Sequence, residues 1–168
     1  MNTVLEVVER GHRLAFTFED LLRYHGPGSP GGVAHAFKVL ERALPRLEPD
    51  GLCERLEISV VTAFGGPGAR DGFEMVTRAV TGGRFEVDPA LERPERGRAL
   101  ERFVFRIGYR GREATLVLRD GFVSDEFIDL ARTDPRSAAQ EARLDRLKGE
   151  MATRLTALPA DAVYDVED

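Results

Sequence analysis

Residues 25–37, His25-Gly-Pro-Gly-Ser-Pro-Gly-Gly-Val-Ala-His-Ala-Phe37, join a glycine-rich loop to the start of a helical apolar pattern. Residues 65–75, Gly65-Gly-Pro-Gly-Ala-Arg-Asp-Gly-Phe-Glu-Met75, repeat that arrangement. Glycine allows backbone amides to approach a ligand or another chain closely. The first amides of a helix have no partner within the helix and bear partial positive charge, so they bind anions. The two loops are therefore the predicted place for a site.

The bulk composition is typical of one globular domain. The chain has 168 residues, of which 42% are hydrophobic and 32% charged, which argues against wholesale disorder. Its net charge of −5 gives no overall attraction to nucleic acid or to anionic membranes. No apolar run is long enough to span a bilayer, the first residues do not resemble a secretory signal, and Cys53 is the only cysteine. We expect a cytoplasmic protein with no nucleic-acid or membrane partner.

Hydrophobic periodicity predicts the order of helices and strands. Helices are expected over residues 2–10, from Thr17 or Asp20 to Tyr24, over 33–47 and ending at Pro45 and Pro49-Asp-Gly51, over 72–80 with Asp71 as its N-cap, over 124–131 with Ser124 as its N-cap, and from Asp134-Pro135 onward. Strands are expected over 56–64 and 84–87 and in a hairpin that turns at Arg110-Gly111, and residues 88–99 are expected to form an exposed loop.

This order predicts an α+β fold. We expect a mixed or antiparallel sheet of about four to six strands, with helices packed on one face and a C-terminal helix. Residues 1–132 would form the core with both glycine loops, residues 133–160 an amphipathic helix, and residues 161–168 a frayed acidic tail. The last helix has a narrow apolar stripe that packs on the domain or on a second copy, which favours a homodimer; it comprises Leu144, Leu147, Met151, Leu155 and Leu158.

Four loop residues are candidates for chemistry. His25 can contact an anion, a metal or a proton, or it can simply satisfy a backbone carbonyl. Ser29 is either a nucleophile, with His25 as its base, or a capping serine. Arg70 is unfavourable at a helix start, which indicates an anionic partner or an ion pair with Asp71 or Glu74. The sequence has no CxxC, HxH or HExxH motif, so no metal site is predicted, and the arginines of residues 93–102 alternate with glutamates as a solvated face.

The loop residues resemble those of the formylmethanofuran dehydrogenase E-like family. That family has an H-G-H-x-C-P-G motif that opens a helix, and here the corresponding residues are His25-Gly-Pro-Gly-Ser-Pro-Gly31. Pro27 and Ser29 replace the second histidine and the cysteine of the motif. Asp71 and Thr81-Gly82 match later family positions, and the resemblance covers residues 14–122. It implies an α+β core, a homodimer and a cleft between the two loops, with the family's expected metal ligands largely replaced.

The sequence therefore predicts a cleft that binds a small anionic ligand. The expected binding residues are His25, Gly28, Ser29, Gly66, Gly68, Arg70 and Asp71. A non-catalytic homodimeric interaction module is the alternative, and a hydrolase using Ser29 and His25 is a third hypothesis. The sequence leaves the ligand, any cofactor and any reaction open.

Overall fold

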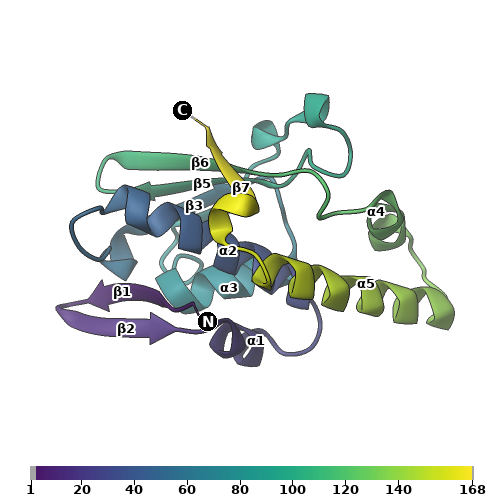
Figure 1. The fold of residues 1–168 in the computed structure, drawn as a ribbon, viewed down its shortest axis with the longest axis horizontal. Coiled ribbons are helices and arrows are strands. Elements are labelled where there is room, and N and C mark those ends of the chain that lie inside the picture. Colours follow the sequence, from purple (N-terminus) through teal and green to yellow (C-terminus); the bar gives the residue numbers. More distant parts are fainter. Residues whose placement is uncertain (1–2, 168) are drawn as a thin grey trace.

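A five-stranded mixed sheet organises the chain, of which the computed structural model describes residues 3–167 (Figure 1). The strand order is β4-β3-β5-β6-β7, with β3 and β4 parallel and the other neighbours antiparallel. The strands are β3 (Ile58–Thr62), β4 (Phe85–Val87), β5 (Val104–Tyr109), β6 (Arg112–Leu118) and β7 (Tyr164–Glu167). The predicted strands and the hairpin at Arg110-Gly111 are confirmed.

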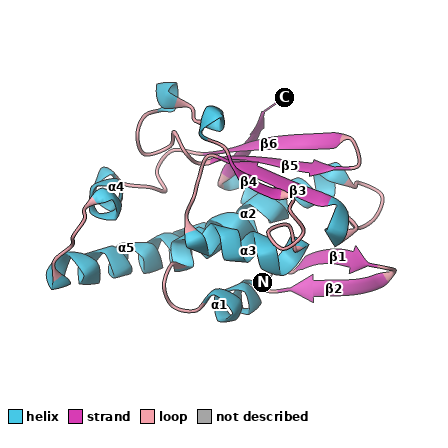
Figure 2. Ribbon diagram, turned by 180° about the vertical axis from the view of Figure 1, so that it is seen from behind, coloured by secondary structure: helices cyan, strands magenta, loops and turns pink. Residues whose placement is uncertain are grey.

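Most of the helices gather on one side of this sheet, and the helix over Asp125–Arg132 lies beyond its end (Figure 2). The described residues form α1 (Phe18–His25), α2 (Pro30–Leu47), α3 (Pro67–Thr77), α4 (Asp125–Arg132) and α5 (Ala138–Thr156). Helix α2 packs against both α3 and α5 and contacts β5 and β6, so it is the centre of the helical layer. The predicted α+β fold is confirmed.

The apolar face of α2 supplies much of the core. Val33, Phe37 and Leu40 recur at helical spacing and are buried, as the sequence predicts. The helix predicted over 33–47 ends at Leu47 as expected, although Pro45 lies inside it, and it begins three residues earlier than predicted, at Pro30. Proline lacks one N–H, and in the last turn its loss removes a single hydrogen bond, so the helix tolerates it there.

The first segment is a hairpin, so the helix expected over residues 2–10 is wrong for its described part. Strands β1 (Leu5–Glu9) and β2 (His12–Phe16) pair antiparallel as a separate two-stranded sheet. Arg10 and Gly11 form the turn, with φ angles of 50° and 82°. Leu5 and Val7 are buried while their neighbours are not, which is the period-two pattern of a strand. The β-branched valines favour that conformation.

The C-terminal segment pairs with the sheet, so the frayed tail expected over 161–168 is wrong for its described residues, 161–167. Asp134-Pro135 is a cis peptide before α5 rather than its first turn, and Ser137 caps the helix instead. Beyond α5, Ala160–Ala162 form a 3-10 turn and β7 pairs with β6. Tyr164 at the start of β7 is fully buried, and this burial holds the tail in the sheet.

The opposite face of the sheet has a smaller cover. Residues 88–99 contain two 3-10 turns, Pro89–Leu91 and Pro94–Arg96, and are not simply an exposed loop. Leu91 is buried with Val104 and Val117, whose side chains point away from the helical layer. This segment then leads to residues 98–103, which approach the starts of α2 and α3.

Candidate functional site

The two glycine-rich loops meet, because the starts of α2 and α3 are in direct contact. A methyl group on Gly68 would lie 2.3 Å from the carbonyl oxygen of Ser29, and one on Gly32 would lie 2.9 Å from the amide nitrogen of Ala69. Any larger residue at either glycine would separate the two helices. The similar loops thus serve first to bring two helix starts together.

Helix α3 begins earlier than the sequence predicts. It starts at Pro67 with Gly66 at the N-cap position, so the assignment of Asp71 as the N-cap is wrong. Proline is favoured in the first turn, and here it begins the helix five residues ahead of the apolar pattern. Arg70 and Asp71 consequently lie one turn inside the helix. Of the two ion-pair partners expected for Arg70, Asp71 contacts His25 and Glu74 pairs with Arg78.

His25 joins the two loops through both ring nitrogens. Its Nδ1 lies 2.7 Å from Oδ2 of Asp71, and its Nε2 accepts the backbone N–H of Ser29 at 3.0 Å. Since Nε2 is an acceptor, Nδ1 carries the proton and donates a hydrogen bond to the carboxylate of Asp71. The side chain of His25 is 8% exposed. The geometry therefore assigns His25 to positioning the first loop, with Nε2 taken by the amide of Ser29 rather than by its hydroxyl.

The starts of α2 and α3 differ from the other helix starts in having no side-chain cap. Neither has a side-chain hydrogen bond at its N-cap, and neither has an acidic residue in its first turn. By contrast, Thr17, Ser124 and Ser137 cap α1, α4 and α5 with their hydroxyl groups, and each of those helices has acidic residues in its first turn. The first-turn amides of α2 and α3 therefore have no partner from a local side chain.

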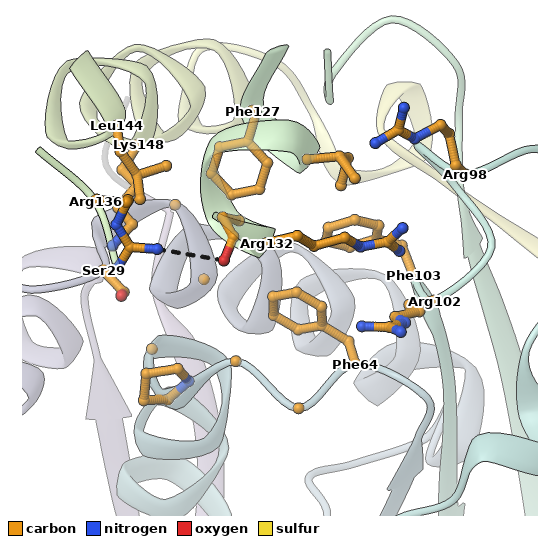
Figure 3. Close-up of a pocket in the computed structure, with 18 residues that line it drawn as sticks. Ser29, Phe64, Arg98, Arg102, Phe103, Phe127, Arg132, Arg136, Leu144 and Lys148 are labelled. Carbon is orange, nitrogen blue, oxygen red and sulfur yellow. Dashed lines mark hydrogen bonds between the residues drawn. The ribbon is translucent and has the colours of Figure 1, made fainter. Parts of the chain in front are cut away.

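A cavity of about 410 Å³ opens at these two uncapped starts (Figure 3). Its volume lies in the range of small-molecule sites. Helix α4, the segment 98–103 and the middle of α5 form its other walls. The lining comprises Ser29, Gly31, Gly32, Phe64, Gly65, Gly66, Pro67, Gly68, Arg98, Arg102, Phe103, Phe127, Ile128, Ala131, Arg132, Arg136, Leu144 and Lys148. Among these described lining residues there are five cationic side chains and no carboxylate.

Three of the lining arginines keep donors available. Arg98, Arg102 and Arg132 form ion pairs with Asp129, Glu92 and Glu101, which lie outside the cavity lining. The Arg102–Glu92 pair spans 3.4 Å and the Arg132–Glu101 pair 3.3 Å, each through one guanidinium nitrogen. A guanidinium has five N–H donors, so these pairs orient the side chains without exhausting them.

The other two lining cations, Arg136 and Lys148, donate hydrogen bonds to other residues of the chain. Arg136 donates through Nε to Glu141 and through one terminal nitrogen to the carbonyls at the end of α4, those of Leu130, Ala131 and Thr133. Lys148 donates from Nζ to the carbonyl of Gly28 at 3.2 Å, which ties α5 to the first loop. Both still add positive charge to this wall.

A buried histidine, His35, lies behind Phe103, one of the aromatic residues that line the cavity. The ring of His35, in the second turn of α2, lies 4.7 Å from that of Phe103, and its Nδ1 lies 2.7 Å from the hydroxyl of Tyr164. Its Nε2 contacts the sulfur of Met151 at 3.1 Å. Because sulfur only accepts, Nε2 carries the proton and Nδ1 accepts from Tyr164. Burial lowers the pKa of His35 to about 3 and raises the pKa of Tyr164 well above its usual value.

The sequence-predicted site residues divide into two groups. Ser29, Gly66 and Gly68 line the cavity, whereas the cavity lining does not include His25, Gly28, Arg70 or Asp71. His25 and Asp71 lie one layer behind Ser29, and Gly28 accepts from Lys148. Arg70 is exposed on α3.

The residues do not fit a transition metal. Both nitrogens of His25 already have partners, and Pro27 and Ser29 supply neither imidazole nor thiolate. Within residues 3–167 no cluster of three or more His, Cys, Asp or Glu side chains is arranged to hold a metal ion. Over the same residues, no helix has both the length and the apolar character needed to cross a bilayer.

No family model matches the chain, and no curated protein matches it.

Sequence reasoning missed the aromatic and cationic walls. Arg98 and Arg102 are exposed and paired with carboxylates, as a solvated mixed-charge face predicts, but they also line the cavity, which the sequence did not indicate. Phe64 follows β3, whereas Phe127 and Arg132 both lie in α4, and these two segments meet only in the folded chain. One local signal in the sequence does point to this site. Position 66, ahead of α3, is not a Ser, Thr, Asp or Asn, so that helix start has no side-chain cap.

Proposed function

We propose that this protein binds a small organic anion in the cavity at the starts of α2 and α3. The observation that carries the proposal is the combination of two uncapped helix starts with a lining that has cationic side chains and no carboxylate among its described residues. Helix starts and guanidinium groups both favour anions, and a partly enclosed cavity strengthens that attraction.

The proposal is one of binding rather than catalysis. Ser29 has its amide, and not its hydroxyl, directed to His25, so the pair lacks the contact that would activate a nucleophile. A relation to the formylmethanofuran dehydrogenase E-like family stays a prediction, as does the homodimer. The stripe that suggested a dimer is mostly used inside the chain, since Leu144, Met151 and Leu155 are buried.

Calorimetric titration with inorganic phosphate tests the proposal. We expect Arg102→Gln to weaken phosphate binding about threefold to tenfold, because it removes one of the five positive charges that line the cavity and attract the anion. Arg119→Gln is the matched control. The side chain of Arg119 is 50% exposed and that of Arg102 is 51% exposed, and each forms one ion pair, with Asp165 and Glu92 respectively.

The two variants make the result decisive. If phosphate binding weakens in Arg102→Gln and stays unchanged in Arg119→Gln, the anion lies in the cavity. If Arg102→Gln and Arg119→Gln bind phosphate with the same affinity, the anion lies outside the cavity. If the natural chain binds no phosphate at millimolar concentration, the proposal is refuted.

A further inference from the structure

The cavity has an aromatic wall that an inorganic anion would not use. Phe64 and Phe127 are both half-buried lining residues, and they come from the end of β3 and from α4. Figure 3 shows their rings pointing into the cavity from different sides. A phosphate group placed against these rings would lose its hydrating water and gain no hydrogen bond in return. The rings therefore indicate that the ligand also has an apolar portion.

The ring of Phe64 is held in place. It stacks on Phe103 with centroids 4.6 Å apart and an interplanar angle of 25°. A methyl group on Gly66 would lie 2.4 Å from a ring carbon of Phe64, so the ring lies directly against the loop backbone. Phe103 itself is 2% exposed and fixed by the ring of His35 behind it. Phe64 thus offers a rigid aromatic surface to the cavity.

Charge lies on both sides of this aromatic surface. In Figure 3 Arg98 and Arg102 lie beside Phe103, whereas Arg136 and Lys148 lie with Ser29 at the other side. Ser29 precedes the uncapped start of α2. A ligand with a ring next to Phe64 and an anionic group toward Ser29 would satisfy both kinds of wall.

We propose that the ligand is an aryl phosphate, with its planar ring between Phe64 and Phe127 and its phosphate at the starts of α2 and α3. This inference rests on the proposed anion-binding function and adds the chemical class of the ligand. Aromatic rings stack on planar rings more favourably than their buried area alone accounts for. A doubly charged phosphate suits two helix starts and several cations better than a carboxylate does.

Calorimetric titration with three probes tests the inference: phenyl phosphate, cyclohexyl phosphate and inorganic phosphate. The two organic esters have the same charge and similar size, and only one is planar. We expect phenyl phosphate to bind about threefold to tenfold more tightly than cyclohexyl phosphate. Phe127→Leu removes one of the two rings and leaves Phe64, so it should lower that ratio to about twofold or less, and it should change the affinity for inorganic phosphate by less than about twofold.

Two further variants control for the fold. Phe127→Tyr keeps the ring and should keep the preference for phenyl phosphate. Phe18→Leu removes a ring that packs edge-on against Phe37 at 6.0 Å, outside the cavity lining, and should leave the ratio unchanged.

The outcomes separate this inference from the proposed function. Binding of all three probes with equal affinities for the two esters overturns the aryl assignment and leaves anion binding intact. A preference for phenyl phosphate that is undiminished in Phe127→Leu overturns the assigned place of the ring. Failure of every probe to bind overturns both proposals.

Discussion

Two groups of helix starts in the helical layer satisfy their first amides in different ways. At α1, α4 and α5 a serine or threonine hydroxyl accepts a first-turn amide, and acidic residues follow. At α2 and α3 glycine and proline surround the helix start, with no side-chain cap and no acidic residue in the first turn. The α2 and α3 starts therefore suit the close approach of the two backbones, and no local side chain satisfies their first-turn amides.

The contact between the α2 and α3 starts should have the largest effect when it is broken. Gly68→Ala places a methyl group 2.3 Å from the carbonyl oxygen of Ser29, and neither backbone can yield easily. We expect the free energy of unfolding to fall by about 3 kcal/mol, as in other overpacked sites. Urea denaturation followed by circular dichroism measures it.

Gly149→Ala is the matched control. Gly149 lies inside α5 with no atom within 4 Å of an added methyl group. Alanine there should stabilise the protein by about 0.5–1 kcal/mol, since it reduces the entropy of the unfolded chain and favours the helix. Similar losses in the two variants would mean that the glycines of the loop do not fix the approach of α2 and α3.

The second prediction concerns how α2 is held without a cap. His35 anchors its second turn to Tyr164, and burial lowers the pKa of His35 to about 3 from 6.5. Between these two values the unfolded chain binds a proton that the folded chain excludes. Stability from this group is therefore complete above pH 6.5 and falls as the pH decreases toward 3, by about 1.4 kcal/mol per pH unit at most.

Urea unfolding at pH 7, 6 and 5 tests this dependence. His35→Gln keeps an acceptor for the hydroxyl of Tyr164 but cannot take up the proton. Its unfolding free energy should fall less than that of the natural chain over this range, by about 2 kcal/mol between pH 7 and 5. Parallel pH profiles would show that His35 is protonated in the folded chain or exchanges with solvent.

The sequence predicted the individual helices and strands better than it predicted how they pack together. Period-two alternation identified β5 and β6, and the spacing of Val33, Phe37 and Leu40 identified α2, because local patterns determine these elements. It failed over residues 5–9, where adjacent apolar residues satisfy a helix and a strand alike and pairing with β2 decides.

The candidate site shows the same limit. Paired glycines and prolines indicated that two helix starts would be open, and Ser29, Gly66 and Gly68 do line the cavity. The walls opposite come from α4 and from residues 98–103, which no local pattern connects to the loops. Packing between distant segments assembles those walls, so only the folded chain reveals that Phe127 and Arg102 line the same cavity.

The smallest predicted effect tests the caps themselves. Ser137 accepts the amide of Gln140 at 3.1 Å, and the Gln140 side chain accepts the amide of Ser137 at 2.9 Å. Ser137→Ala should therefore lower the free energy of unfolding by about 1 kcal/mol. Ser29→Ala should change it by no more than about 0.5 kcal/mol, because the Ser29 hydroxyl makes no cap bond to α2.

The unfolding free energies of Ser137→Ala and Ser29→Ala are then measured again in the presence of inorganic phosphate. A ligand that binds only the folded chain at 100 times its dissociation constant adds about 2.7 kcal/mol of stability. Ser137→Ala should gain that increment in full, because α5 is capped by its own residues and the capping serine does not line the cavity. An equal loss in Ser29→Ala and Ser137→Ala without phosphate would mean that the Ser29 hydroxyl caps α2 in solution. The amides of α2 would then be satisfied internally, and the distinction between the two kinds of helix start would disappear.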